Sequence, residues 1–285
     1  MPRTFRILNV FALPGQPLSG NPLCVVEDAT GLTPATMQAV ARQFNLSEST
    51  FVVAGGPDTD ATVRVFTPSV ELAFAGHPTL GTAYVVGQRL GRDEVVLGMP
   101  AGRIPVRGQG SVWTLTANPT VVRPAAVSQA AAAQMVGLAP DLVVAEPVWV
   151  DSGLEQLFVQ VADPAAVEAA LPDSLAVRQH AMTDRGEALC YVWAWAGPAD
   201  VSARLFFSQD TALVEDPATG SAAANLGGWL AHEGRRDLRV RIDQGRAVRR
   251  PSRLDVEVDA AGVVRVGGLV HEIGRGTLDV DDQDR

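Results

Sequence analysis

Two short segments, far apart in the chain, have the composition of a helix start that can bind an anion. They are Gly76–Ala83 (GHPTLGTA) and Asp216–Ala223 (DPATGSAA). Each places a proline after a polar residue and continues with small and apolar residues, which is typical of the first turn of a helix and puts His77 and Asp216 at or beside the N-cap. The free backbone N–H groups of a helix start attract negative charge. The two openings together therefore predict a site for a small carboxylate.

The segments that follow these openings are apolar or small on almost every side, which is typical of buried helices. Strand-like segments, with β-branched content or alternating polarity, make up most of the remaining chain. Many strands and one buried helix, occurring twice, predict an α+β fold of two similar domains. Each is a barrel-like sheet around a central helix, and the active site lies in the cleft between them. We expect the first domain over residues 1–118 with the C-terminal tail from about 272 to 285, and the second over residues 119–271.

Three further helices are predicted from their first residues. Thr33 precedes a proline and a segment with apolar residues at helical spacing. Ser128 precedes an alanine-rich segment that runs through Val136, and Pro164–Leu171 has the composition of a short helix.

The composition excludes several classes of chemistry. The chain has 285 residues, and all 23 basic residues are arginine. Without a lysine there is no Schiff base with pyridoxal phosphate and no Walker-A phosphate loop. A formal net charge of −9 argues against a nucleic-acid partner. The one basic stretch, Arg235–Arg253, alternates like a strand and is predicted to be a solvated sheet face.

Metal, membrane and secretion signals are not found in the sequence. The four histidines show no metal-binding spacing, so we expect no metal. No apolar run approaches the roughly 20 residues of a membrane helix, and the first residues lack a signal-peptide core, so a cytoplasmic enzyme without a membrane partner is expected. Cys24 and Cys190 lie among apolar neighbours and are predicted to be buried thiols.

Five blocks of the sequence resemble, in the same order, the phenazine-biosynthesis PhzF-like proteins, which share the two-domain diaminopimelate-epimerase fold. The resemblance runs nearly end to end. It departs from the family's usual pattern at Ala73 and in the slightly longer segment Ala12–Pro17. The blocks are Val10-Phe11 with Gly20-Asn21-Pro22, Asn45–Phe51 (NLSESTF), Thr67-Pro68 with Glu71–Gly81 (ELAFAGHPTLG), Glu215–Ala222 (EDPATGSA), and Arg250-Pro251-Ser252 with Val266-Gly267-Gly268.

The resemblance implies a cofactor-independent isomerase that moves a proton between carbons of a small cyclic or amino carboxylate. It implies that Glu48 is the general acid/base and that His77 and Asp216 are its catalytic companions. It also implies a homodimer. The residues that it places in substrate binding are Asn21, Ser47, Gly76, Gly220 and Ser221.

Simpler structural roles compete with these assignments. Glu48 could be an ordinary loop carboxylate. Asp216 and His77 could serve only as helix caps. Ser221 could be a small residue that allows close helix packing. Two functions also remain open besides the isomerase: a non-catalytic carboxylate-binding protein of the same fold, and a racemase that works through Glu48 and His77. The related epimerases and proline racemases use one cysteine at each opening. Neither opening contains a cysteine here, which excludes that two-thiol chemistry.

Overall fold

The computed structural model describes residues 2–209 and 212–280. The chain forms two compact units. One comprises the chain through Thr116 together with the segment from Gly267 onward, and the other comprises Ala117–Val266. None of the described helices is long and apolar enough to cross a membrane.

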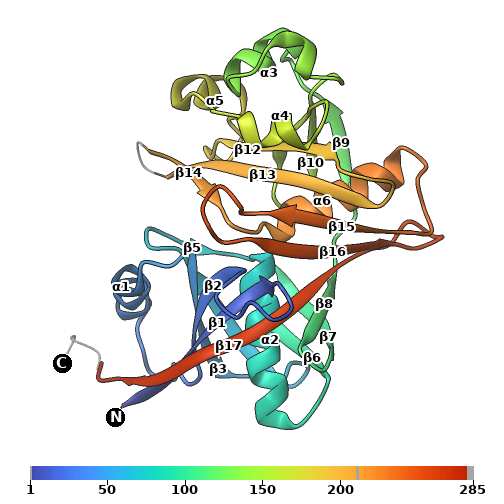
Figure 1. The fold of residues 1–285 in the computed structure, drawn as a ribbon. Helices are drawn as coiled ribbons and strands as arrows, with labels where there is room; N and C mark the ends of the chain where they lie inside the picture. The colour runs from blue at the N-terminus through green and yellow to red at the C-terminus, as the bar shows by residue number, and fades with distance from the viewer. Residues whose placement is uncertain (1, 210–211, 281–285) are drawn as a thin grey trace. The chain divides into compact units, whose positions relative to one another are not determined.

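Eight strands of the first unit form a closed barrel (Figure 1). The pairing runs β1–β2–β3–β4–β6–β7–β8–β17 and returns to β1, with parallel pairs between β2 and β3 and between β4 and β6. The strands are β1 (Arg3–Ala12), β2 (Asn21–Val26), β3 (Glu48–Ala54), β4 (Ala61–Phe66), β6 (Glu94–Met99), β7 (Gly102–Gln109), β8 (Val112–Thr116) and β17 (Val264–Leu278). The short β5 (Glu71–Leu72) pairs with β4.

Helix α2 (Gly76–Leu90) fills the interior of this barrel and packs against strands on every side, including β1, β3, β6 and β8. Its residues from His77 through Ala83 are all buried, as the all-round apolar composition predicts. The helix ends at Gly91, which adopts a left-handed conformation with φ 65°. Gly81 brings the helix close to the sheet, because an added Cβ would lie 2.5 Å from the Leu23 side chain and 3.0 Å from that of Val10.

We expect Gly81→Ala to lower the free energy of unfolding by about 1 to 3 kcal/mol, because overpacking outweighs the gain in helix propensity. Urea unfolding measures this change. Gly56→Ala is the matched control, since its added methyl would have only the Thr59 hydroxyl nearby, at 3.8 Å. Equal stability of the two variants would contradict this close packing of α2 on the strands.

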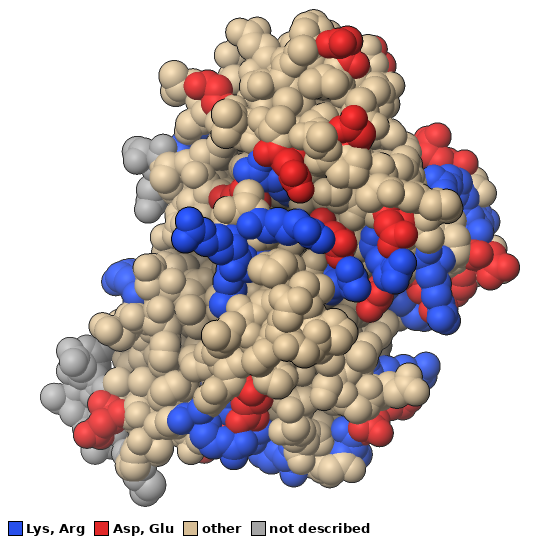
Figure 2. Space-filling view, viewed as in Figure 1, with Lys and Arg blue, Asp and Glu red and all other residues tan. Residues whose placement is uncertain are grey.

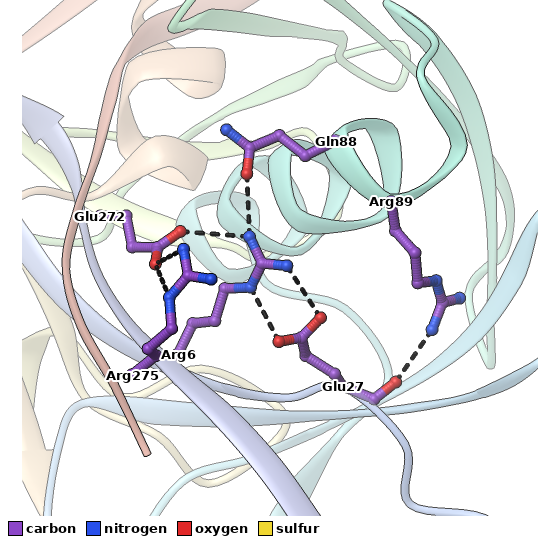
Figure 3. A network of polar contacts seen from close by, with 6 residues as sticks. All are labelled: Arg6, Glu27, Gln88, Arg89, Glu272 and Arg275. Carbon is purple, nitrogen blue, oxygen red and sulfur yellow. Dashed lines mark hydrogen bonds and ion pairs between the residues drawn. The ribbon is translucent and has the colours of Figure 1, made fainter.

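A network of charged side chains joins one side of the barrel to the last turns of α2 (Figure 3). Arg6 in β1 donates two hydrogen bonds to the Glu27 carboxylate at 2.8 and 2.9 Å. Its third nitrogen donates to Gln88 of α2 at 2.8 Å and to Glu272 of β17 at 3.1 Å. Glu272 also accepts from Arg275 at 2.9 Å. Because the side chains of Arg6 and Glu27 are only 11% and 15% exposed, loss of one partner would leave a largely desolvated charge.

Helix α1 (Pro34–Phe44) covers the outer face of β2 and β3. Thr33 caps it by accepting from the Thr36 amide at 3.2 Å, which confirms the predicted helix start. Met37, Val40 and Ala41 form its buried face, and they pack in one cluster with Cys24 and other strand residues.

The second unit contains a mixed sheet in the order β9–β10–β11–β12–β13–β15–β16, with β14 paired to β13. Its strands are β9 (Val121–Pro124), β10 (Val148–Asp151), β11 (Gln156–Gln160), β12 (Leu189–Trp195), β13 (Asp200–Gln209), β14 (Ala212–Asp216), β15 (Leu238–Gln244) and β16 (Ser252–Val258). Its helices are α3 (Gln129–Met135), the 3-10 turn η1 (Pro140–Leu142), α4 (Pro164–Ala169), α5 (Ser174–His180) and α6 (Gly220–His232).

Helix α6 is the central helix of this unit. It packs against β16 at one end of the strand order and against β9 and β10 at the other, so the sheet curves around it. Helices α3, α4 and α5 cover the opposite face of β11 and β12. The expected α+β class, with a barrel-like sheet around a central helix in each half, is confirmed.

The short helices follow their capping residues. Ser128 caps α3 by accepting from the Ala131 amide at 3.2 Å, as predicted. The helix predicted at Pro164 is present as α4, which Asp163 caps. Helix α5 was not predicted, although Asp173 caps it in the same way through the Ala176 amide at 2.8 Å.

The basic stretch is a solvated sheet face, as expected. Alternate residues of β15 are buried, and the arginines of β15 and β16 pair with acidic residues of β13, β15 and β16. Arg239 lies 3.2 Å from Glu257, and Arg253 lies 3.0 Å from Asp243. Figure 2 shows positive and negative side chains intermixed on the face in view.

The two cysteines are core thiols, as predicted. Both are fully buried and free, Cys24 in β2 and Cys190 in β12. Burial raises the pKa of each thiol to about 12, so neither is a thiolate at neutral pH.

Candidate active site

The turn between α1 and β3 positions Glu48. Asn45 ends the helix in a left-handed conformation, φ 51°, and its amide bonds the Ala41 carbonyl at 3.0 Å. The chain then enters β3 with Glu48 as the first residue of the strand, opposite Leu23 of β2. The Glu48 side chain is 17% exposed, so it is partly desolvated yet still accessible. It is therefore not an ordinary solvated loop carboxylate.

A buried hydrogen bond holds this strand against the central helix. The Thr50 and Thr82 hydroxyls lie 2.8 Å apart and join β3 to α2. Because side chains alternate along a strand, Glu48 and Thr50 project to the same face of β3. The Thr50 contact therefore directs Glu48 toward α2 as well.

His77 lies in the first turn of α2 and is nearly buried, with a side chain 5% exposed. Its ring bonds the Pro22 carbonyl, which can only accept, and the Nε2 atom has no hydrogen-bond partner among the described residues. Nδ1 is therefore the donor. Burial lowers the pKa of His77 to about 3, against the opposing effect of the Pro22 bond, so the ring is neutral at physiological pH with a lone pair on Nε2.

The Nε2 atom of His77 lies 3.7 Å from Oε2 of Glu48. With a neutral ring this contact is no ion pair. A carboxylate oxygen and an imidazole lone pair are both acceptors, so they attract only when a proton lies between them. The Nε2 atom of His77 is therefore an acceptor that faces the Glu48 carboxyl.

The other predicted residues of this opening lie nearby. Ser47 precedes Glu48, and its hydroxyl donates to the Asn21 side-chain oxygen at 3.2 Å. Asn21 is fully buried at the start of β2, next to the Pro22 that bonds His77. Gly76 is the first residue of α2, where Ala75 is the N-cap. The structure therefore brings Asn21, Ser47, Glu48, Gly76 and His77 together, and it corrects the expectation of His77 as a cap residue.

Asp216 is not the N-cap of its helix. Helix α6 begins at Gly220 with Thr219 as the N-cap, and Asp216 is the last residue of β14. The proline that follows it lies outside the helix, so the expected start at the Asp-Pro pair is wrong by three residues. The Asp216 carboxylate instead accepts from the Thr219 hydroxyl at 2.6 Å. Its carboxylate therefore lies next to the start of α6, where this hydrogen bond restrains it.

Gln244 at the end of β15 holds the segment between Asp216 and α6. Its amide nitrogen donates to the Asp216 carbonyl and to the Thr219 hydroxyl, each at 2.9 Å. The next residue, Gly245, adopts φ 80°, and any side chain there would collide with the Pro217 carbonyl. Since Gln244 is 2% exposed, the hydrogen bonds of its side chain are almost completely shielded from solvent.

Gly220 and Ser221 are the first two residues of α6, so their amides are among those that a helix start leaves without an intrahelical acceptor. Ser221 is partly exposed, whereas Ala222 through Gly228 are all buried. The Ser221 hydroxyl accepts from the Gln156 side chain at 3.0 Å. Ser221 therefore has a specific polar partner, which close helix packing alone does not require.

The sequence offered no signal for the residues that hold the predicted ones in place. Each of them contacts residues distant in the chain, and they are Pro22, Thr50, Gln156 and Gln244. Single polar residues in strands carry no pattern that identifies such contacts.

A family model described as phenazine biosynthesis-like protein, PhzC-PhzF, matches residues 8–270 of the chain. The chain is 36% identical over 280 residues to an uncharacterized isomerase of Pasteurella multocida, covering 97% of this chain and 94% of that protein. It is 35% identical over 269 residues to the trans-2,3-dihydro-3-hydroxyanthranilate isomerase of Pseudomonas aeruginosa, covering 90% of this chain and 91% of that protein.

Among solved structures, the fold is similar to that of a PhzF-family phenazine biosynthesis protein of Bacillus anthracis. The TM-score is 0.86 at 22% sequence identity, covering 98% of this chain and all of that one. At this identity the likeness concerns the fold, and it agrees with the barrel-and-helix architecture described above.

Proposed function

Because this chain belongs to the phenazine biosynthesis-like PhzC-PhzF family, we propose that it is an isomerase in which Glu48 moves a proton between two carbons of a small carboxylate. The isomerase class follows from its relatives, two of which carry that name. The role of Glu48 and the carboxylate substrate are our inference from the site.

The observation that carries the proposal is the neutral His77 ring 3.7 Å from the Glu48 carboxyl. In the proposed cycle the Glu48 carboxylate removes a proton from a substrate carbon and becomes a carboxylic acid. The new O–H can reach the Nε2 lone pair of His77 once a small side-chain movement shortens the 3.7 Å separation, and this contact stabilises the protonated Glu48 without taking the proton away. Glu48 then returns the proton to a different carbon of the substrate. This step regenerates the Glu48 carboxylate, and the product has the same atoms as the substrate.

The start of α6 supplies what the substrate carboxylate needs. The amides of Gly220 and Ser221 and the Ser221 hydroxyl are donors at the positive end of a helix. A carboxylate bound there draws electron density from the adjacent carbon framework and fixes the substrate's orientation. Asp216, held by Thr219, is proposed as the polar companion of this opening.

The first substrate to test is the one named for a relative, trans-2,3-dihydro-3-hydroxyanthranilate. We would incubate it with the wild-type protein in D₂O, next to a panel of cyclic and amino carboxylates, and follow the products by proton NMR. A rearranged product from one substrate confirms an isomerase and identifies its class. Scrambling of a stereocentre without rearrangement would indicate a racemase instead. Binding without any exchange across the panel would contradict the proposed catalysis.

A further inference from the structure

A buried amide network beneath α6 has only one consistent orientation, and Asn225 determines it. Asn225 is fully buried in α6. Its side chain contacts the backbone amide of Ser152 at 2.7 Å. Since a backbone N–H can only donate, the atom facing it must be the Asn225 oxygen. The Asn225 nitrogen, with its two hydrogens, therefore points the other way.

That nitrogen lies 2.9 Å from each of three oxygens: the Val150 carbonyl, the Leu154 carbonyl and the Gln156 side-chain oxygen. The two carbonyls can only accept, which agrees with the orientation of Asn225. Gln156, also fully buried, must turn its oxygen toward Asn225, because the reversed amide would place two donors against each other. Its nitrogen is thereby directed at Ser221.

The Gln156 nitrogen donates to the Ser221 oxygen at 3.0 Å. This bond occupies a lone pair of the hydroxyl and leaves its hydrogen to be donated elsewhere. None of the described residues accepts that hydrogen. Ser221 is the partly exposed residue in the first two turns of α6, so its hydrogen is available to a ligand.

We propose that Gln156 is a positioning residue that makes Ser221 a hydrogen-bond donor and so selects a substrate group that can only accept. A carboxylate is such a group, whereas an amide in its place presents a donor as well. The inference rests on the proposed function, which assigns Ser221 to the substrate carboxylate. It adds that Asn225 holds the Gln156 amide in one orientation, so Ser221 cannot readily turn its hydrogen toward Gln156.

The test compares Gln156→Met, Ser221→Ala and the double variant. Methionine has a similar shape and no amide. The Gln156→Met variant should fold, because both hydrogens of the Asn225 nitrogen still have acceptors, the Val150 and Leu154 carbonyls. The probe is 3-hydroxyanthranilate, an aromatic analogue of the relative's named substrate, with the corresponding carboxamide as the neutral control. Isothermal titration calorimetry gives each dissociation constant.

We expect Ser221→Ala to weaken binding of the acid by about 10-fold or more, as for a hydrogen bond to a charged group. Gln156→Met should weaken it about 3- to 10-fold, and it should have no further effect when Ser221 is already alanine. The preference of the wild type for the acid over the carboxamide should shrink in both single variants. A purely structural role of Gln156 would instead weaken binding equally in both backgrounds.

A second variant, Gln156→Glu, gives a pH signature. The ionised carboxylate can only accept, so it should draw the Ser221 hydrogen inward. Its protonated form can again donate to Ser221. Affinity for the probe, relative to Gln156→Met at the same pH, should therefore fall as pH rises, and more steeply than for the same pair of variants in the Ser221→Ala background, where only repulsion between the two carboxylates remains. An equal pH dependence in the two backgrounds would contradict the orientation argument.

The outcomes separate the two proposals. If Ser221→Ala weakens the binding of the acid but Gln156→Met does not, the positioning role fails and the proposed carboxylate contact stands. If Ser221→Ala has no effect, or if the wild type does not bind the acid, the carboxylate assignment fails and the positioning role fails with it.

Discussion

Glu48→Gln should lower kcat by about a thousandfold on any substrate that the wild type isomerises, within the range expected for loss of a general acid/base. The amide cannot take up a proton from carbon, so neither half of the proposed transfer can occur. The substitution keeps the size and shape of the side chain. Its N–H₂ group places a donor, in place of the native carboxyl oxygen, 3.7 Å from the acceptor His77 Nε2, so the fold should be preserved.

The measurement is turnover and deuterium incorporation in D₂O, combined with a thermal melt of the same preparation. Glu94→Gln is the control. It makes the same chemical change at an exposed glutamate, 72% accessible, that pairs loosely with Arg107 at 3.1 Å. Substantial turnover by a well-folded Glu48→Gln protein would rule out Glu48 as the base.

The second large effect concerns stability at acidic pH. The pKa of His77 is about 3 in the folded protein and about 6.5 in an unfolded chain, because burial disfavours the charged ring. Between these values the unfolded state binds a proton that the folded state does not. Stability therefore falls as pH drops from about 6.5 toward 3, by about 1.4 kcal/mol per pH unit from this group alone. Above pH 6.5 both states are neutral and the effect vanishes.

Replacing the histidine removes this dependence. We expect the unfolding free energy of His77→Gln, measured by urea titration from pH 7 to pH 4, to decline by a few kcal/mol less than that of the wild type. The comparison uses the change in unfolding free energy with pH, so a loss of stability that is the same at every pH does not affect it. His232→Gln, at an exposed position in the last turn of α6, should retain the wild-type profile. Parallel profiles for wild type and His77→Gln would contradict a buried, neutral His77.

Local patterns in the sequence predicted the elements well where the cause is itself local. The caps at Thr33 and Ser128 lie within three residues of the amides that they bind. The composition after Gly76 is apolar on all sides because α2 lies inside a barrel. Asp216 shows the limit of such patterns, since an Asp-Pro pair also begins turns. Here the polar contacts of Gln244 support a turn before the helix.

The sequence by itself determined the family, the α+β class with two central helices, and the set of residues at each helix opening. The family follows from the resemblance carried by five motifs in order, whereas the class and the two central helices follow from composition and periodicity, which are properties of neighbouring residues. Only the tertiary structure decided how the site residues are held. It places the Pro22 carbonyl on the His77 ring, Thr50 on Thr82, and Gln156 between Asn225 and Ser221. Each of these contacts joins residues from different elements, so it exists only once the chain has folded, and the protonation and hydrogen-bond direction of the site depend on it.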